Sequence, residues 1–300
     1  MKKGFFAVVN PAAGGGRCGK LAAAALARLR AAGVELEVAE TSSPGQGAQL
    51  TREAHAAGYR QFLAVGGDGT ANEIVNGIFP RSELDDRPAL AFLPLGTGNS
   101  FLRDFTDRGT DHTAEALLSG RRQACDILRL THGGGVLYFI NLLTLGFAAD
   151  VAAVTNRRFK PLGELGYILG VLTRIARLDR RAFPHRVDNA GEFDRRRCLF
   201  LAFSNTKFTG GKMMIAPQAD PTDGQIEFVR WGPIGRLGLL RNFPTLFDGT
   251  HIRHPLASRA AARRIDFELT GPVDVMVDGE SLMLDCKTIE VLPAALDVLV

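Results

Sequence analysis

The sequence of 300 residues contains no apolar run as long as the roughly 20 residues that a membrane-spanning helix requires. The longest apolar stretch, residues 136–149, is interrupted by Asn141 and Thr144. No signal peptide is expected either, because the apolar stretch at residues 4–9 is too short. These absences predict a soluble protein that stays in the cytoplasm.

Cysteine is scarce, and its four copies lie far apart in the chain. They are Cys18, Cys125, Cys198 and Cys286, and no two of them form a CxxC pair. The sequence therefore predicts neither a zinc site nor a disulfide framework. We expect four buried, reduced thiols.

A strong charge of one sign is also lacking, because 36 Lys and Arg face 32 Asp and Glu, a net charge of +4. With 46% hydrophobic residues the composition is that of a globular protein, which excludes a disordered chain. Part of the basic excess is clustered, which predicts either a solvated face or an affinity for anionic surfaces. Lipid headgroups are favoured over nucleic acid, because no zinc finger, RNA-binding signature or basic-region heptad accompanies the charge. The clustered residues are Arg157, Arg158, Lys160, Arg174, Arg177, Arg180, Arg181, Arg195, Arg196 and Arg197.

The first 125 residues alternate between strand and helix patterns. Gly33 and Gly58 each follow an expected helix at the position that favours glycine. This alternation predicts an α/β domain over residues 1–125, with a doubly wound parallel sheet covered by helices on both faces. The expected strands are residues 5–9, 34–39, 62–65 and 89–93, and the expected helices are residues 20–32, 47–57 and 72–78.

After about residue 125 the pattern changes to consecutive strands, which is typical of an antiparallel sandwich or barrel. We expect a mostly antiparallel β-sandwich domain over residues 126–289, with residues 290–300 as a candidate addition to the first domain. The expected strands are residues 127–131, 136–143, 198–205, 226–231, 265–270, 273–277 and 288–292, and one helix is expected at residues 162–178.

Three strands of the first domain are expected to end in glycine-rich loops, at residues 10–16, 66–72 and 96–99. Ligands of parallel α/β sheets bind at these carboxyl ends of the strands. Glycine lets the backbone approach a ligand closely, and successive N–H groups beside a helix N-terminus form an anion site. A single loop of this kind is ordinary turn chemistry, but three at successive strand ends predict a phosphate-bearing ligand.

The phosphate fingerprints GxGxxG and GxxxxGK[ST] are both absent, and the second glycine loop contains Asp68 instead. A carboxylate among phosphate-binding amides would repel the phosphates unless it has a task. It would hold a Mg²⁺ ion that bridges the phosphates, or accept a proton from an attacking hydroxyl group. The structural alternative is a cap for the helix that we expect to begin near Asn72.

Five segments resemble, in order, the motifs of the diacylglycerol kinase catalytic-domain superfamily, which includes sphingosine and ceramide kinases and bacterial soluble lipid kinases. The most specific is GGDGTANE at residues 66–73, which resembles GGDGTxNE. NAD kinases and phosphofructokinases share GGDG alone, but the five motifs together cover nearly the whole chain. The other four are residues 9–11 with the following glycines (NPxxG), 94–99 (PxGTxND), 215–224 (APxAxxxDGxL) and 278–280 (DGE).

The resemblance implies a two-domain lipid kinase, with a nucleotide-binding α/β domain similar to that of NAD kinases, a β-sandwich, and an active site in the cleft between them. It implies transfer of the γ-phosphate of ATP to a lipid hydroxyl group with Mg²⁺ as the metal, in phospholipid biosynthesis. An NAD kinase-type phosphotransferase and a non-catalytic lipid-binding relative remain open as alternatives.

The resemblance also implies roles for individual residues. Glu280 is the candidate base for the lipid hydroxyl group, and Asp68 organises the catalytic Mg²⁺ or is the rival base. Asp223, with the backbone carbonyls of Asp220 and Gln225, would hold a structural Mg²⁺, although an ordinary type I turn explains the same residues. The residues expected to bind ATP are Asn10, Thr41, Gly66, Gly67, Asp68, Gly69, Thr70, Ala71, Asn72, Gly96, Thr97 and Arg103, the last as a charge that neutralises the transferred group.

The sequence departs from the family pattern at two positions. Ser100 stands where the bacterial lipid kinases usually have aspartate, and Asp104 is a candidate replacement. Gly15 stands where a lysine is often found, and Arg17 is a candidate to supply the charge. Asp126 does match a family acid that is linked to the metal. The departures affect the handling of phosphate and metal.

The lipid acceptor is the least specified part of the prediction. Residues 146–150, GFAAD, resemble the GFxAD segment of sphingosine and ceramide kinases, whose aspartate binds a polar headgroup, so Asp150 is a candidate substrate ligand. Diacylglycerol is the expected acceptor and a sphingoid or other long-chain alcohol the alternative. We expect peripheral binding to the anionic inner face of the membrane and no nucleic acid partner, with a homodimer left open.

Overall fold

The structure is a computed structural model that describes residues 2–81, 87–154 and 173–300. The chain forms two compact units. The first consists of Met1–Ile127 together with Pro293–Val300, and the second of Leu128–Leu292. The first unit is therefore discontinuous in sequence, and each unit is described by itself.

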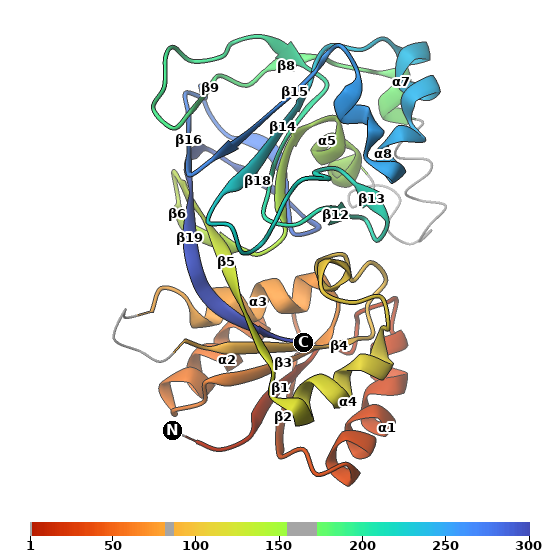
Figure 1. Cartoon of the computed structure of the whole chain (residues 1–300), viewed down its shortest axis with the longest axis vertical. Helices are drawn as coiled ribbons and strands as arrows, with labels where there is room; N and C mark the ends of the chain where they lie inside the picture. The colour runs from red at the N-terminus through yellow and green to blue at the C-terminus, as the bar shows by residue number, and fades with distance from the viewer. Residues whose placement is uncertain (1, 82–86, 155–172) are drawn as a thin grey trace. The chain divides into compact units, whose positions relative to one another are not determined.

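A parallel sheet forms the centre of the first unit, in the order β2-β1-β3-β4-β19 (Figure 1). Neighbouring strands run parallel throughout, including Asp297 of β19 beside Ala89 of β4. This confirms the predicted parallel α/β domain. The strands are β1 (Phe5–Val9), β2 (Leu36–Glu40), β3 (Gln61–Gly66), β4 (Ala89–Pro94) and β19 (Cys286–Leu299), and β5 (Arg122–His132) pairs with β19.

Helices cover both faces of this sheet, because successive strand residues point to opposite sides. Leu63 and Val65 belong to one core with α1 (Arg17–Ala31) and α4 (Thr110–Ser119). Phe62 faces the other way, where its ring packs against His55 of α2 (Gln46–Ala56), and α2 packs on α3 (Asp68–Ile78). The expectation that the helix after the second glycine loop begins near Asn72 is wrong, because that helix already begins at Asp68. Helix α4 was not expected from the sequence, and neither was the short 3-10 helix η1 (Phe101–Asp104).

The second unit is an antiparallel β-sandwich, as predicted. One sheet has the order β15-β14-β11-β7-β17-β18, and the other contains β6, β5, β19, β16 and β9. Side chains from both sheets, among them Leu145, Phe203 and Ile289, form the core between them. The bounds are β6 (Gly135–Phe139), β7 (Leu142–Gly146), β9 (His185–Val187), β11 (Phe200–Ser204), β14 (Ile226–Trp231), β15 (Ala257–Ala262), β16 (Arg264–Phe267), β17 (Val273–Val277) and β18 (Glu280–Leu284).

Helical segments pack against the outer face of the first of these sheets, where Phe200 and Trp231 contact Leu239 and Leu246 in a second core. They are α5 (Phe147–Val154), α7 (Arg236–Asn242), α8 (Thr245–Asp248) and the 3-10 helix η4 (Thr250–Arg253), and the remaining short strands are β8 (Arg181–Ala182), β10 (Arg197–Cys198), β12 (Phe208–Thr209) and β13 (Met213–Met214). No helix in the described part of the chain is long and apolar enough to cross a membrane.

Two expected strands are each divided in the structure. Residues 136–143 form β6 and the start of β7, because the N–H groups of residues 140–142 bind the Asp278 carboxylate instead of a neighbouring strand. Residues 198–205 form β10 and β11, because the chain changes pairing partner at Leu199. Most of the helix expected at residues 162–178 lies outside the described residues, and residues 173–176 are helical.

The four cysteines are buried free thiols, as predicted. Burial raises the pKa of the Cys198 and Cys286 thiols to about 12. Thiols that stay protonated in this way are poor nucleophiles and poor metal ligands. The chemistry of the molecule therefore lies elsewhere.

Candidate functional site

The three glycine loops of the first unit touch one another through their backbones. The Gly96 N–H donates to the Gly66 carbonyl at 2.7 Å, and a Cβ atom on Gly96 would lie 2.5 Å from the Gly67 Cα atom. A Cβ atom on Gly14 would likewise lie 2.8 Å from the Leu95 carbonyl oxygen. Such close approach of main chains requires residues without side chains. The fold therefore assembles the loops at the carboxyl ends of β1, β3 and β4 into one surface.

Asp68 connects the second loop to the third. Its Oδ2 atom accepts the Ser100 N–H at 2.8 Å, and its Oδ1 atom accepts the Phe101 N–H at 3.1 Å. Asp68 therefore binds the N-terminus of η1 and does not serve as the N-cap of its own helix, a position held by Gly67. Burial raises the pKa of Asp68 above its ordinary value, while these two N–H donors and the charge of Arg103 act to lower it.

A small cavity of about 180 Å³ adjoins the third loop. Arg17 and Arg103 line it, with Thr97, Asn99 and backbone of the glycine loop. The Arg17 guanidinium donates to the Gly96 carbonyl at 2.9 Å. The Asn99 Oδ1 atom is buried with no hydrogen-bond partner among the described residues, so it can accept a bond from a ligand. Two guanidinium groups beside a glycine loop suit a phosphate.

The other residues expected to bind ATP occupy the same edge of the sheet. Asn10 follows β1, and its side chain accepts the Ala12 N–H at 3.1 Å, which shapes the first loop. Thr41 follows β2 and donates its N–H to the Val9 carbonyl at 2.8 Å. Gly69, Thr70, Ala71 and Asn72 form the first turn of α3. Gly15 has a φ of +65° and open space around it, so no side chain replaces the family's lysine there.

Sequence reasoning missed the role of Glu73. Its carboxylate accepts the N–H groups of Gly45 and Gly47 at 2.9 and 2.7 Å, so it caps the N-terminus of α2. The sequence did single out this residue, because Glu73 is the last residue of the GGDGTANE segment. Asp126 also has a structural contact, since its Oδ1 atom accepts the Ala294 N–H at 2.7 Å.

In the second unit, the segment DGE forms the turn of the β17–β18 hairpin. Asp278 and Gly279 both have positive φ, which is the geometry of a type I′ turn. The buried Asp278 carboxylate accepts three N–H groups, from Ile140, Asn141 and Leu142, at 2.9–3.0 Å. The turn is thus fixed to the neighbouring strand, and it presents Glu280 at the surface.

An apolar cavity of about 240 Å³ lies beside this turn, within the second unit. Gly279, the residue before Glu280, is part of its wall. Among the polar groups of the wall is the Thr144 hydroxyl, which is buried without a hydrogen-bond partner among the described residues. The remaining wall comes mainly from α5, β11 and the α7–α8 region, with Phe147, Ala148, Val151, Ala152, Leu199, Phe200, Met213, Ile215, Leu239, Phe243, Leu246 and Met276. The cavity suits an aliphatic chain.

Asp150 lies on α5 but is not free to receive a ligand. Its carboxylate forms ion pairs with Arg174 and with Arg181, the latter at 2.5 Å, and its side chain is only 6% exposed. Both arginines would have to be displaced before Asp150 could bind a headgroup. In this structure the residue anchors α5.

The segment around Asp223 is an exposed turn. The Asp223 N–H donates to the Asp220 carbonyl at 3.4 Å, and the Asp223 carboxylate accepts the Gln225 N–H at 2.9 Å. Its oxygen ligands are of the kind that Mg²⁺ prefers, but the Asp220 carboxylate already accepts the N–H and hydroxyl groups of Thr222. Among the described residues, no group of three or more His, Cys, Asp and Glu side chains is placed to hold a metal.

Comparison with known families finds two matching models. Residues 4–130 match the diacylglycerol kinase catalytic domain. Residues 141–300 match the YegS C-terminal NAD kinase beta sandwich-like domain. The two matches together cover almost the whole chain.

Individual relatives match over similar lengths. A protein of Mycobacterium tuberculosis (strain H37Rv) named "Diacylglycerol kinase" is 30% identical over 297 residues, which are 98% of this chain and 94% of the relative. A protein of Pectobacterium atrosepticum named "Probable lipid kinase YegS-like" is 31% identical over 91% of this chain and 88% of its own length.

Solved structures share the fold. One from Bacillus anthracis strain Sterne has a TM-score of 0.79 at 23% identity, covering 100% of this chain and 96% of that one. Another from the same strain, described as a diacylglycerol kinase, has a TM-score of 0.69 at 19% identity, covering 100% of this chain and 98% of its own.

Proposed function

This chain belongs to the family of the diacylglycerol kinase catalytic domain. On that premise we propose that it transfers the γ-phosphoryl group of ATP to the hydroxyl group of a membrane lipid, with diacylglycerol as the favoured acceptor. One observation carries the proposal within this chain. The DGE turn places a carboxylate, Glu280, directly after a residue that lines an apolar cavity. A lipid chain in that cavity would bring its polar end to a base.

The first unit supports the nucleotide half of the reaction. Its three glycine loops meet beside the N-terminus of α3, and Arg17 and Arg103 line a cavity at the third loop. Backbone amides and guanidinium groups are the usual ligands of the phosphates of ATP. We assign ATP to this surface.

The proposed reaction is a direct displacement. The lipid oxygen attacks the γ-phosphorus atom, the bond from that atom to the β–γ bridging oxygen breaks, and ADP leaves. Glu280 accepts the hydroxyl proton as the new P–O bond forms, and Arg103 stabilises negative charge on the transferred group. Asp68 is the alternative base, although its two hydrogen bonds to η1 favour a positioning role.

We include Mg²⁺ in the proposal, because kinases use this ion to neutralise the phosphates and align them for transfer. Asp68 in the first unit, and Asp223 with the carbonyls of Asp220 and Gln225 in the second, are the oxygen groups of this chain that would hold it. Asp68 keeps its negative charge more reluctantly than an exposed aspartate, since burial raises its pKa.

Diacylglycerol is favoured as the acceptor because of the cavity wall and because of the name of the M. tuberculosis relative. A sphingoid base or another long-chain alcohol is the alternative, as the YegS-like relatives carry only the broader name of lipid kinase. A bilayer substrate also requires docking at the membrane surface. The arginine-rich segments are the candidate contacts, and Arg157, Arg158 and Lys160 among them lie outside the described residues.

The test is transfer of label from [γ-³²P]ATP to a panel of acceptors: diacylglycerols with chains of four, six and eight carbons, sphingosine, and NAD. Label should enter the diacylglycerols, and kcat/KM should rise with chain length, because each buried methylene contributes about 0.8 kcal/mol, or roughly fourfold. Transfer to NAD alone, or to no acceptor, would contradict the proposal.

Ala152→Phe tests whether the apolar cavity binds the acceptor, because Ala152 lines the cavity and the larger side chain would fill it. The KM for eight-carbon diacylglycerol should rise while the KM for ATP stays unchanged. An equal rise in both values would mean that the substitution disturbs the whole fold and that the cavity has no special role in acceptor binding.

A further inference from the structure

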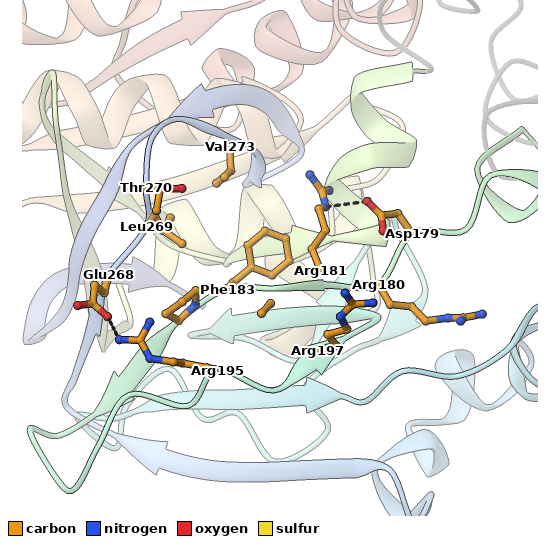
Figure 2. A pocket seen from close by; sticks show the side chains of 12 residues that line it. Asp179, Arg180, Arg181, Phe183, Arg195, Arg197, Glu268, Leu269, Thr270 and Val273 are labelled. Carbon is orange, nitrogen blue, oxygen red and sulfur yellow. Dashed lines mark hydrogen bonds and ion pairs between the residues drawn. The ribbon is translucent and has the colours of Figure 1, made fainter.

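A second cavity, of about 490 Å³, opens elsewhere in the second unit and is bordered by arginine (Figure 2). Arg180 and Arg181 line it at the start of β8, and Arg195 and Arg197 line it just before and at the start of β10. The two segments meet because β8 and β10 are paired antiparallel, with Arg197 opposite Ala182. The fold thus collects four cations that lie far apart in groups of two along the chain.

Acidic side chains compensate these cations only in part. Arg195 pairs with Glu268 and Arg181 with Asp179, as the dashed lines in Figure 2 show. Arg181 also pairs with the buried Asp150, at 2.5 Å. Asp179 and Glu268 line the cavity, and the Arg180 guanidinium donates to the Ile234 carbonyl at 3.0 Å. Arg197 is exposed and has no ion pair among the described residues. Arg197, with the exposed Arg195 beside it, is therefore the part of the wall that can receive an anion.

The run of three arginines at residues 195–197 is divided by the backbone. In an extended segment successive side chains point in opposite directions. Arg195 and Arg197 accordingly line the cavity, whereas Arg196 points away and binds Asp194, with the closest contact at 2.7 Å.

The rest of the wall is apolar except for Thr270. Phe183 is buried in its floor under the Arg181 guanidinium, 5.3 Å from the ring centre, and Pro184, Leu269 and Val273 complete it. An inorganic ion alone would leave this surface uncovered. A phosphate group attached to an apolar moiety would contact both parts of the wall.

We propose that this arginine cavity is a binding site for a phosphate ester that carries an apolar group, separate from the loops that bind ATP. Guanidinium groups recognise phosphate oxygens by paired hydrogen bonds, and Arg195 and Arg197 are the groups that would supply them here. The headgroup of an anionic phospholipid and a soluble phosphate ester share this chemistry, and the experiment separates them.

The variant for the test is Arg195→Gln/Arg197→Gln, and the matched control is Arg196→Gln. Arg195 and its partner Glu268 are both more than half exposed, so the double variant should fold normally. The control removes a charge from the same segment but outside the cavity. Arg181 is left intact, because it also holds Asp150 next to the proposed acceptor cavity.

Two binding measurements are made on the full chain without turnover, so neither depends on the proposed kinase activity. In the first, vesicles of phosphatidylcholine with and without phosphatidylglycerol are sedimented with each protein. In the second, sn-glycerol 3-phosphate and hexyl phosphate are titrated calorimetrically, with ATP present to saturate the first unit. The double variant should bind the probe about thirtyfold more weakly, at about 1 kcal/mol per lost cation near the surface.

Loss of binding to phosphatidylglycerol vesicles in the double variant, with the control unaffected, supports the cavity as a lipid headgroup site. Loss of hexyl phosphate binding with unchanged vesicle binding supports a soluble phosphate ester instead. Equal weakening by the control and the double variant, or no weakening by either, overturns the proposal and leaves the arginines as a solvated surface.

Discussion

The two acidic residues with a role in the proposed reaction, Asp68 in the first unit and Glu280 in the second, differ in how firmly their side chains are held. Both carboxylate oxygens of Asp68 accept backbone N–H groups. Glu280 is exposed, and its side chain makes no hydrogen bond or ion pair with any of the described residues. A proton acceptor needs free oxygens, whereas a residue that shapes a loop needs bound ones. Substitutions at the two positions should therefore have different effects on rate and stability.

Glu280→Gln should lower kcat at least about a hundredfold, because it removes a base while keeping the shape of the side chain. Thermal stability and ATP affinity should stay near the parent values, since the carboxylate has no structural contact. Glu192→Gln, in an exposed loop of the same unit, is the control. A near-normal rate for Glu280→Gln would transfer the base role to Asp68.

Asp68→Asn should abolish turnover and also lower stability. An asparagine offers one oxygen, so its NH₂ group would oppose the N–H of Ser100 or Phe101, at a cost of about 1–3 kcal/mol. Kinase rate and the midpoint of thermal unfolding, measured on the same preparation, check this. If the rate persisted while stability fell, Asp68 would be a residue of the fold alone.

At the scale of elements, the β17–β18 hairpin depends on one carboxylate. Asp278→Ala would leave three buried N–H groups without an acceptor, which should lower the free energy of unfolding by at least about 3 kcal/mol. Asp278→Asn keeps an oxygen and tolerates positive φ, so it should lose less. Urea unfolding of both variants tests the ranking, and equal losses would show that the three bonds contribute little.

The elements that local chemistry specifies were predictable from the sequence. Gly33 and Gly58 end helices with φ of +94° and +97°, and the glycine loops follow parallel strands as expected. Contacts between distant residues were not predictable. Glu73 caps a helix 26 residues earlier, and Asp126 binds an amide 168 residues later. No local pattern encodes such partners, because they depend on the finished packing.

At the scale of the whole molecule, two buried histidines should make stability depend on pH. Burial lowers the pKa of His185 and of His251 below the ordinary value of about 6.5. The unfolded chain therefore binds more protons than the folded chain once the pH falls below about 6.5. The stability that is present above pH 6.5 is lost progressively as the pH falls through the pKa values that the two histidines have in the folded chain.

The midpoint of thermal unfolding should accordingly decrease between pH 7 and pH 5. NMR titration of the two imidazole groups is the direct measurement, and both should titrate below 6.5. An unfolding midpoint that stays constant or rises over this range, together with normal imidazole pKa values, would contradict the prediction.

Strand β19 has a consequence for how the protein is made. Its residues 297 and 298 pair with β4, and the Ala294 N–H binds Asp126, so residues 293–300 complete a unit that begins at residue 1. During translation the parallel sheet of the first unit leaves the ribosome with the edge of β4 unpaired, and this edge stays unpaired until the entire second unit has been synthesised. Domains commonly fold in the order of their synthesis. Here the unit that is translated first is the one that is completed last.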